Sequence, residues 1–88
     1  MKIFAKNSKD EIVPIEDISE NTQVKEIKKR LIDKYNINTE VEEIVLIHNG
    51  EELGEDEETL EYYDITDGIT ILFVRRYNAG YNKYKNLI

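Results

Sequence analysis

The sequence predicts an α+β fold of two layers, in which a sheet packs against a single helix. One amphipathic helical segment lies between short segments with strand character, which gives the order β-β-α-β-loop-β. The helical segment has only one apolar stripe, so a sheet is needed to cover it. The last apolar segment, residues 69–75, comes so late in the chain that it must pair with an earlier strand.

The first two segments predict a β-hairpin. Residues 1–6 alternate between apolar and polar side chains, which is typical of a half-buried strand with Phe4 on its outer face. Residues 12–15 predict a second strand, and the short polar residues between the two favour a turn. Because Pro14 has no N–H to donate, we expect the second strand at an edge of the sheet.

The next segment predicts a helix of about three turns. Val24, Ile27 and Leu31 recur at helical spacing, and Tyr35 follows one turn later. Lysines occupy the opposite face, and Lys28 is among those that we expect in solvent.

Signals for both ends of this helix are present. Asn21 and Thr22 are both suitable N-cap residues, and the sequence does not choose between them. Asn36 tolerates a left-handed backbone, so we expect it to end the helix.

The second half predicts two strands joined by an acidic loop. Residues 44–47 form a short apolar run rich in β-branched side chains, which Asn49-Gly50 ends with a turn. Isolated apolar side chains then predict a loop that wraps the domain and is anchored in the core, at Leu53, Leu60 and Ile65. Residues 59–63 are compatible with a single helical turn, and Asp67-Gly68 predicts the turn before the last strand.

Composition limits the possible partners. The chain has 88 residues, enough for one domain, and carries 19 acidic and 12 basic side chains for a net charge of −7. This charge argues against nucleic acid or an anionic membrane as a main partner. The chain has no cysteine, and its first residues lack the apolar core of a signal peptide. We expect a monomer in the cytoplasm or the nucleus.

The residues that catalysis or metal binding would need are scarce. His48 is the single histidine, and no nucleophile or carboxylate near it in the sequence suggests a catalytic triad. The acidic residues 51–58 lack the alternating ligands of a calcium-binding EF-hand loop and have no glycine at the sixth position that such a loop requires. The sequence therefore predicts a protein that is not an enzyme and binds no metal or other cofactor.

Four segments together resemble the ubiquitin family. In chain order they read MKIFAK, VKEIKKRLIDKYNI, IVLIHNGEEL and TLEYYDITDGITI. The resemblance covers residues 1–76 and implies the β-grasp fold, a ubiquitin-like roll in which a mixed sheet packs on one helix. Residues 77–88 would then be a flexible C-terminal tail or a linker.

The resemblance also implies which side chains meet a partner. It places the last strand at the sheet centre, with Ile69, Ile71 and Phe73 toward the helix and Thr70, Leu72 and Val74 outward. Ubiquitin itself is recognised largely through an apolar patch on the exposed face of the sheet. By alignment that patch contains Ile47, Leu72 and Val74. A cluster of exposed apolar side chains is itself typical of a partner site.

Two further residues complete the predicted protein-binding set. His48 follows Ile47 directly, and Arg76 falls on an arginine that ubiquitin uses toward its activating enzyme. The chain also departs from ubiquitin, with Ser8 in place of a leucine and Leu72 in place of a histidine of the patch. These departures argue against tight binding by ordinary ubiquitin receptors.

The C-terminal residues leave the class of function open. The family's conjugated members end in Gly-Gly, whereas this chain has Ala79-Gly80 at that place and continues for eight residues, YNKYKNLI. One hypothesis is an interaction domain that is not conjugated, alone or within a larger protein, and that binds ubiquitin-binding domains. The alternative is a divergent modifier, processed after Gly80 by ubiquitin-like activating and processing machinery and conjugated through the new carboxylate. A third is a structural domain that scaffolds a larger complex.

Overall fold

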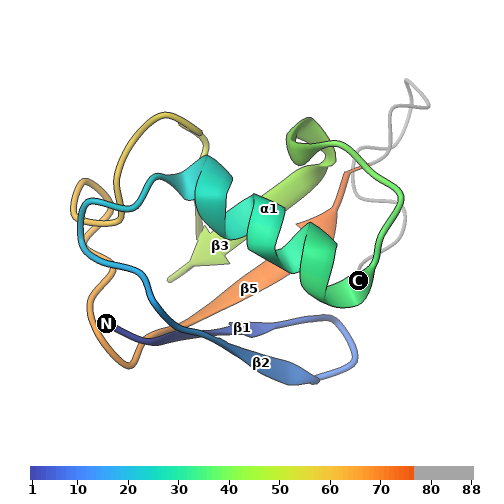
Figure 1. Cartoon of the computed structure of the whole chain (residues 1–88), viewed down its shortest axis with the longest axis horizontal. Coiled ribbons are helices and arrows are strands. Elements are labelled where there is room, and N and C mark those ends of the chain that lie inside the picture. Colours follow the sequence, from blue (N-terminus) through green and yellow to red (C-terminus); the bar gives the residue numbers. More distant parts are fainter. Residues whose placement is uncertain (77–88) are drawn as a thin grey trace.

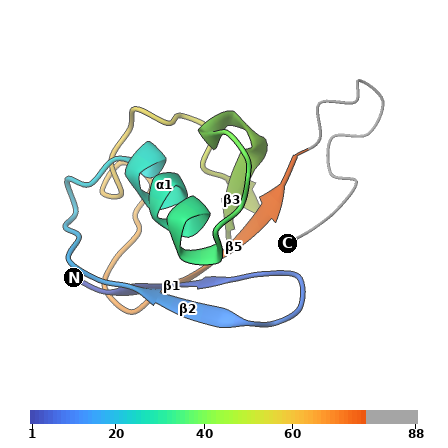
Figure 2. The same cartoon turned by 45° about the vertical axis from the view of Figure 1, so that its right-hand side comes forward.

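The computed structural model describes residues 1–76, which form a sheet and one α-helix in two layers (Figure 1). The elements in chain order are β1 (Ile3–Lys6), β2 (Ile12–Ile15), α1 (Val24–Tyr35), the 3-10 helix η1 (Val41–Glu43), β3 (Ile44–His48), β4 (Glu51–Glu52) and β5 (Thr70–Arg75). Figure 2 shows α1 lying across one face of the sheet. Within the described residues, no helix is long and apolar enough to cross a membrane.

The sheet has five strands in the order β2-β1-β5-β3-β4. β5 pairs in parallel with β1 and antiparallel with β3, so the last strand lies at the centre of the sheet, as predicted. β2 is an edge strand, which confirms the expectation from Pro14. The sequence did not predict β4, because two exposed glutamates show no alternation. The turn before it, Asn49-Gly50, has positive φ at both residues, as a tight hairpin requires.

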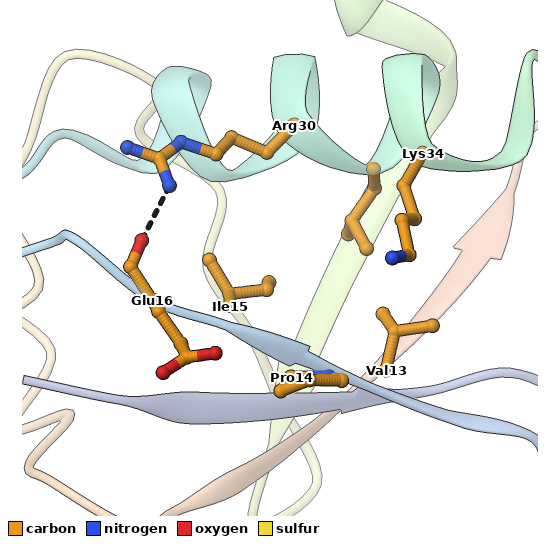
Figure 3. Close-up of a pocket in the computed structure, with 7 residues that line it drawn as sticks. Val13, Pro14, Ile15, Glu16, Arg30 and Lys34 are labelled. Atoms are coloured by element: carbon orange, nitrogen blue, oxygen red, sulfur yellow. Dashed lines mark hydrogen bonds between the residues drawn. The ribbon is translucent and has the colours of Figure 1, made fainter.

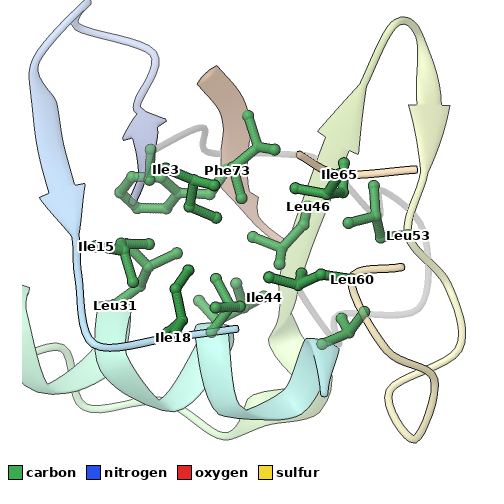
Figure 4. Close-up of a cluster of buried hydrophobic side chains, with 14 residues drawn as sticks. Ile3, Ile15, Ile18, Leu31, Ile44, Leu46, Leu53, Leu60, Ile65 and Phe73 are labelled. Atoms are coloured by element: carbon green, nitrogen blue, oxygen red, sulfur yellow. The ribbon is translucent and has the colours of Figure 1, made fainter. Parts of the chain in front are cut away.

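The core lies between the sheet and α1 and is closed at one end by the loop that follows β4 (Figure 4). The predicted loop anchors Leu53, Leu60 and Ile65 are all buried. Ile71 and Phe73 are fully buried as expected, whereas Ile69 is half-buried at the margin. The cluster consists of Ile3, Ala5, Ile15, Ile18, Val24, Ile27, Leu31, Ile44, Leu46, Leu53, Leu60, Ile65, Ile71 and Phe73.

The start of α1 differs from the prediction. The N-cap residue is Gln23, not Asn21 or Thr22, and its side chain makes no capping hydrogen bond. The Thr22 hydroxyl instead accepts a hydrogen bond from the Ser19 N–H in the preceding turn, at 2.9 Å. The far end agrees with the prediction, because Asn36 adopts the left-handed conformation.

The acidic loop replaces the missing side-chain cap. The first amides of a helix have no partner within the helix. Here the Val24 N–H donates to the Glu58 carbonyl at 2.9 Å, and the Lys25 N–H donates to the Asp56 carbonyl at 3.0 Å. Residues 60–64 form a turn with two successive backbone hydrogen bonds, from Tyr63 to Leu60 and from Asp64 to Glu61, and Thr59 bridges to Gln23. The loop is therefore a structural part of the helix N-terminus.

Lys28 is buried, contrary to the prediction that it lies in solvent. Only 4% of its surface is exposed, and its ammonium group lies 2.6 Å from the Asp56 carboxylate. The loop that caps α1 also covers this part of the helix. A lysine can be buried there because Asp56, on the same loop, pairs with it.

Replacing Asp56 with alanine tests the contribution of this pair. The Lys28 ammonium would stay buried without its counter-charge. We expect the free energy of unfolding to fall by about 2–4 kcal/mol, since losing one partner of a buried pair is costly and Asp56 is only about a third exposed. Urea unfolding at neutral pH measures the change.

The matched control is Glu57→Ala on the same loop. Glu57 pairs with Lys25 at 2.6 Å, but its side chain is 72% exposed. Such a pair should contribute less than about 1 kcal/mol. Equal losses in the two variants would contradict a special role for Lys28 and Asp56.

Candidate protein-binding surface

The outer face of the sheet is the one that points away from α1. It carries a row of side chains that crosses all five strands. Strand register sets Ile12 opposite Lys6, Lys6 opposite Leu72, Leu72 opposite Ile47 and Ile47 opposite Glu52. Leu72 is 44% exposed and Ile12 is 56% exposed, while Ile47 is half-buried. The structure therefore brings two predicted residues, Leu72 and Ile47, side by side near the sheet centre. Ile12, at the edge, was not among the predicted residues.

Val74 also belongs to the outer face, but it is not exposed as the resemblance implied. It lies two residues beyond Leu72 and directly opposite Val45. Val74 is only 8% exposed and Val45 only 1% exposed, although neither is part of the core cluster. Side chains on the outer face must therefore cover both valines.

Arg76 follows Val74 by two residues, so its side chain starts on the same side of the sheet. Its backbone N–H donates to the Glu43 carbonyl, so it lies beside the start of β3. Its guanidinium donates to the Glu52 carboxylate at 2.7 Å, and Glu52 lies beyond β3 on β4. The two residues of the ion pair therefore lie on opposite sides of β3.

His48 does not join Ile47 on the outer face. Successive side chains of a strand point to opposite faces, so His48 lies on the side of α1 and the acidic loop. It lines a hollow of about 260 Å³ together with Asn49, Glu51, Leu53, Tyr63 and Asp64. Within residues 1–76, no three histidine, aspartate or glutamate side chains are grouped to hold a metal ion. Gly80, the predicted processing site, and the rest of 77–88 lie outside the described residues.

A second hollow, of about 110 Å³, lies between β2 and α1 (Figure 3). Its apolar lining comes from Val13, Ile15 and Leu31, and Arg30 and Lys34 project from the helix above it. An apolar groove beside an edge strand can accept an added strand, provided that the edge offers free backbone groups.

The backbone of this edge is poorly suited to such pairing. The Phe4 N–H donates toward β5, to the Ile69 carbonyl, so the backbone of its partner Pro14 faces the open edge. Pro14 has no N–H to offer there. Just beyond β2, the Arg30 guanidinium donates to the carbonyls of Glu16 and Asp17. Both features protect the edge against another strand, and the outer face remains the better candidate surface.

The end of β5 is held by Glu43. This carboxylate accepts hydrogen bonds from the Thr39 hydroxyl and from the Glu40 N–H, and it lies 3.9 Å from the Arg75 guanidinium. Arg75 also donates to the Asn38 carbonyl at 3.2 Å. The Thr39 hydrogen bond, followed by that of Glu40 and the charge of Arg75, lowers the pKa of Glu43 against the opposing effect of burial.

Replacing Thr39 with valine should raise the pKa of Glu43 toward its ordinary value. Because the folded-state pKa lies below the unfolded one, the stability that Glu43 contributes is present above the unfolded pKa. That stability is lost as the pH falls through the folded pKa. Carboxyl-carbon NMR titration measures the shift. Identical titration curves for Glu43 in both proteins would contradict the role of the Thr39 hydroxyl.

Comparison with known proteins agrees with this architecture. The family model described as the ubiquitin family matches residues 3–78, a range that contains every helix and strand of the structure. No curated protein gave a significant match to the chain. Proteins of this family are generally not enzymes. The mixed five-stranded sheet with one helix is the predicted α+β, β-grasp arrangement, and the chain belongs to the ubiquitin family.

Proposed function

We propose that this chain is a ubiquitin-like protein-interaction domain that binds protein partners through the outer face of its sheet. The observation that carries the proposal is Leu72, which is 44% exposed on the central strand with Ile47 directly opposite. A sheet face that meets water normally presents polar side chains. An exposed leucine at the centre of such a face is better explained by a partner that covers it.

The size of this surface indicates contacts of modest affinity. Fully burying a leucine or isoleucine side chain contributes roughly 1.5–3 kcal/mol, and Leu72 and Ile47 are already partly covered. Two such side chains supply only part of the free energy that even a micromolar complex needs, about 8 kcal/mol. Polar contacts around Leu72 and Ile47 must supply the rest.

The charges of the chain favour a basic partner. The net charge of −7 steers positively charged proteins toward the domain and repels acidic ones. Glu52 ends the row of Leu72 and Ile47. Ubiquitin-binding domains are the partner class that the family suggests. We further propose that the domain acts as a monomer in the cytoplasm or nucleus, alone or as a module of a larger protein.

Chemical-shift mapping with a panel of ubiquitin-binding domains tests the surface. With any domain that binds, we expect the largest shifts at Leu72 and Ile47, and Leu72→Lys should weaken binding by at least about tenfold, equivalent to ~1.4 kcal/mol. Thr70→Lys is the matched control, because Thr70 is exposed on the same strand and should leave affinity within about threefold. Binding that leaves Leu72 and Ile47 unshifted would rule out this surface.

A second candidate function rests on the sequence after the last strand. Ala79-Gly80 follows Arg76 closely, at the place where conjugated members of the family carry Gly-Gly. Under this proposal, cleavage after Gly80 releases a modifier that is conjugated through its new carboxylate. Intact mass spectrometry of the protein from its native cell should then find a chain that ends at Gly80. A protein that always ends at Ile88, or extends beyond it, would exclude processing.

A further inference from the structure

We infer that the Arg76–Glu52 ion pair is a removable cover over a second apolar strip, Val45 and Val74, which a partner carrying its own cation uncovers. The inference rests on the proposed function of the outer face and adds how its contact area is regulated. With the cover closed, the apolar contact surface is confined to Leu72 and Ile47. With it open, the two valines extend that surface.

The burial of the two valines comes from the outer side. Val45 and Val74 lie directly opposite each other, and in a paired register they share one face of the sheet. Their neighbours along the strands, Leu46 and Phe73, belong to the core, so the valines point the other way. They are nevertheless 1% and 8% exposed.

The path of the ion pair explains this burial. The sheet order places β5 and β4 on opposite sides of β3, so a contact from Arg76 to Glu52 must cross β3. Arg76 starts beside Glu43, whereas Glu52 lies opposite Ile47, four residues further along β3. That separation is about 13 Å, and a path between the two ends passes over Val45.

The covered strip is continuous with the exposed one. Val74 lies two residues from Leu72 on β5, and Val45 lies two residues from Ile47 on β3. Across these two strands, Val74 lies directly opposite Val45 and Leu72 directly opposite Ile47. Opening the ion pair therefore creates one four-residue apolar surface without any change in the backbone.

A cation from a partner can replace Arg76 in this ion pair. The Arg76 side chain is 30% exposed and that of Glu52 is 38% exposed, so water and salt reach both charges. Pairs of this kind contribute little to stability and are screened by salt. A partner whose arginine or lysine binds Glu52 keeps that carboxylate paired while Arg76 moves aside. The net charge of −7 favours such a cation over an acidic partner.

Glu52→Gln tests the cover without any partner. The variant keeps the shape of the side chain and removes its charge. We expect a neutral gadolinium chelate to relax the Val45 and Val74 methyl groups more strongly in this variant. The rise should be roughly 1.5- to 5-fold, because losing an exposed ion pair shifts the equilibrium between closed and open cover by about that factor. High salt should produce the same rise in the unaltered chain but not in the variant.

Glu51→Gln is the matched control. Glu51 is the adjacent residue of β4 and is also exposed, so this variant changes the net charge equally. It should leave the relaxation of both valines unchanged, and the Leu72 methyls should respond little in either variant. Unchanged relaxation at Val45 and Val74 in Glu52→Gln would overturn the inference. It would not affect the proposed function, which shift mapping at Leu72 tests separately.

The sign of the partner's charge has its own test. Phenethylammonium and phenylacetate serve as small probes, because they have the same aromatic ring and opposite charges. In methyl-detected titrations at equal ionic strength, we expect phenethylammonium to shift Val45 and Val74 more strongly, and Glu52→Gln to remove this preference. Equal shifts with both probes, shifts with neither, or a preference for phenylacetate would reject a cationic partner.

Discussion

The parallel pairing of β5 with β1 is the constraint on which the rest of the structure depends. It joins the two ends of the domain: the Phe4 N–H donates to the Ile69 carbonyl at 2.9 Å, and the Gly68 N–H donates to the Lys2 carbonyl at 2.7 Å. Parallel strands cannot be joined by a tight turn, so the chain between them must cross a face of the sheet. That crossing places α1 on one face and leaves the other face without a helix to cover it.

The loop after β4 carries the second consequence of this pairing. It has to return the chain from the sheet edge to its centre, and on the way it passes the start of α1. There its carbonyl groups receive the helix amides, and Asp56 neutralises Lys28. An acidic segment that looks like plain solvated surface in the sequence therefore holds the helix in place.

Local patterns predicted the parts of the fold that depend on local chemistry. The apolar spacing of α1, the left-handed Asn36, the Asn49-Gly50 turn and the edge position of Pro14 all follow from neighbouring residues. The N-cap and the burial of Lys28 were missed because they depend on contacts with residues about thirty positions away. At the candidate surface, the resemblance to the family placed Leu72 and Ile47 on the outward face. The burial of Val74 was missed, and the ion pair between Arg76 and Glu52, which we infer to cover it, is contained in no local pattern.

The burial of Lys28 also determines which amines of this domain can be modified. Its side chain is 5% exposed and its ammonium is paired with Asp56, so an acyl donor reaches it only when the loop opens. Lys34, by contrast, lies on the exposed part of the same helix. Any chain of modifiers attached to the folded domain would therefore grow from its exposed lysines. Attachment at Lys28 would report local unfolding of the acidic loop.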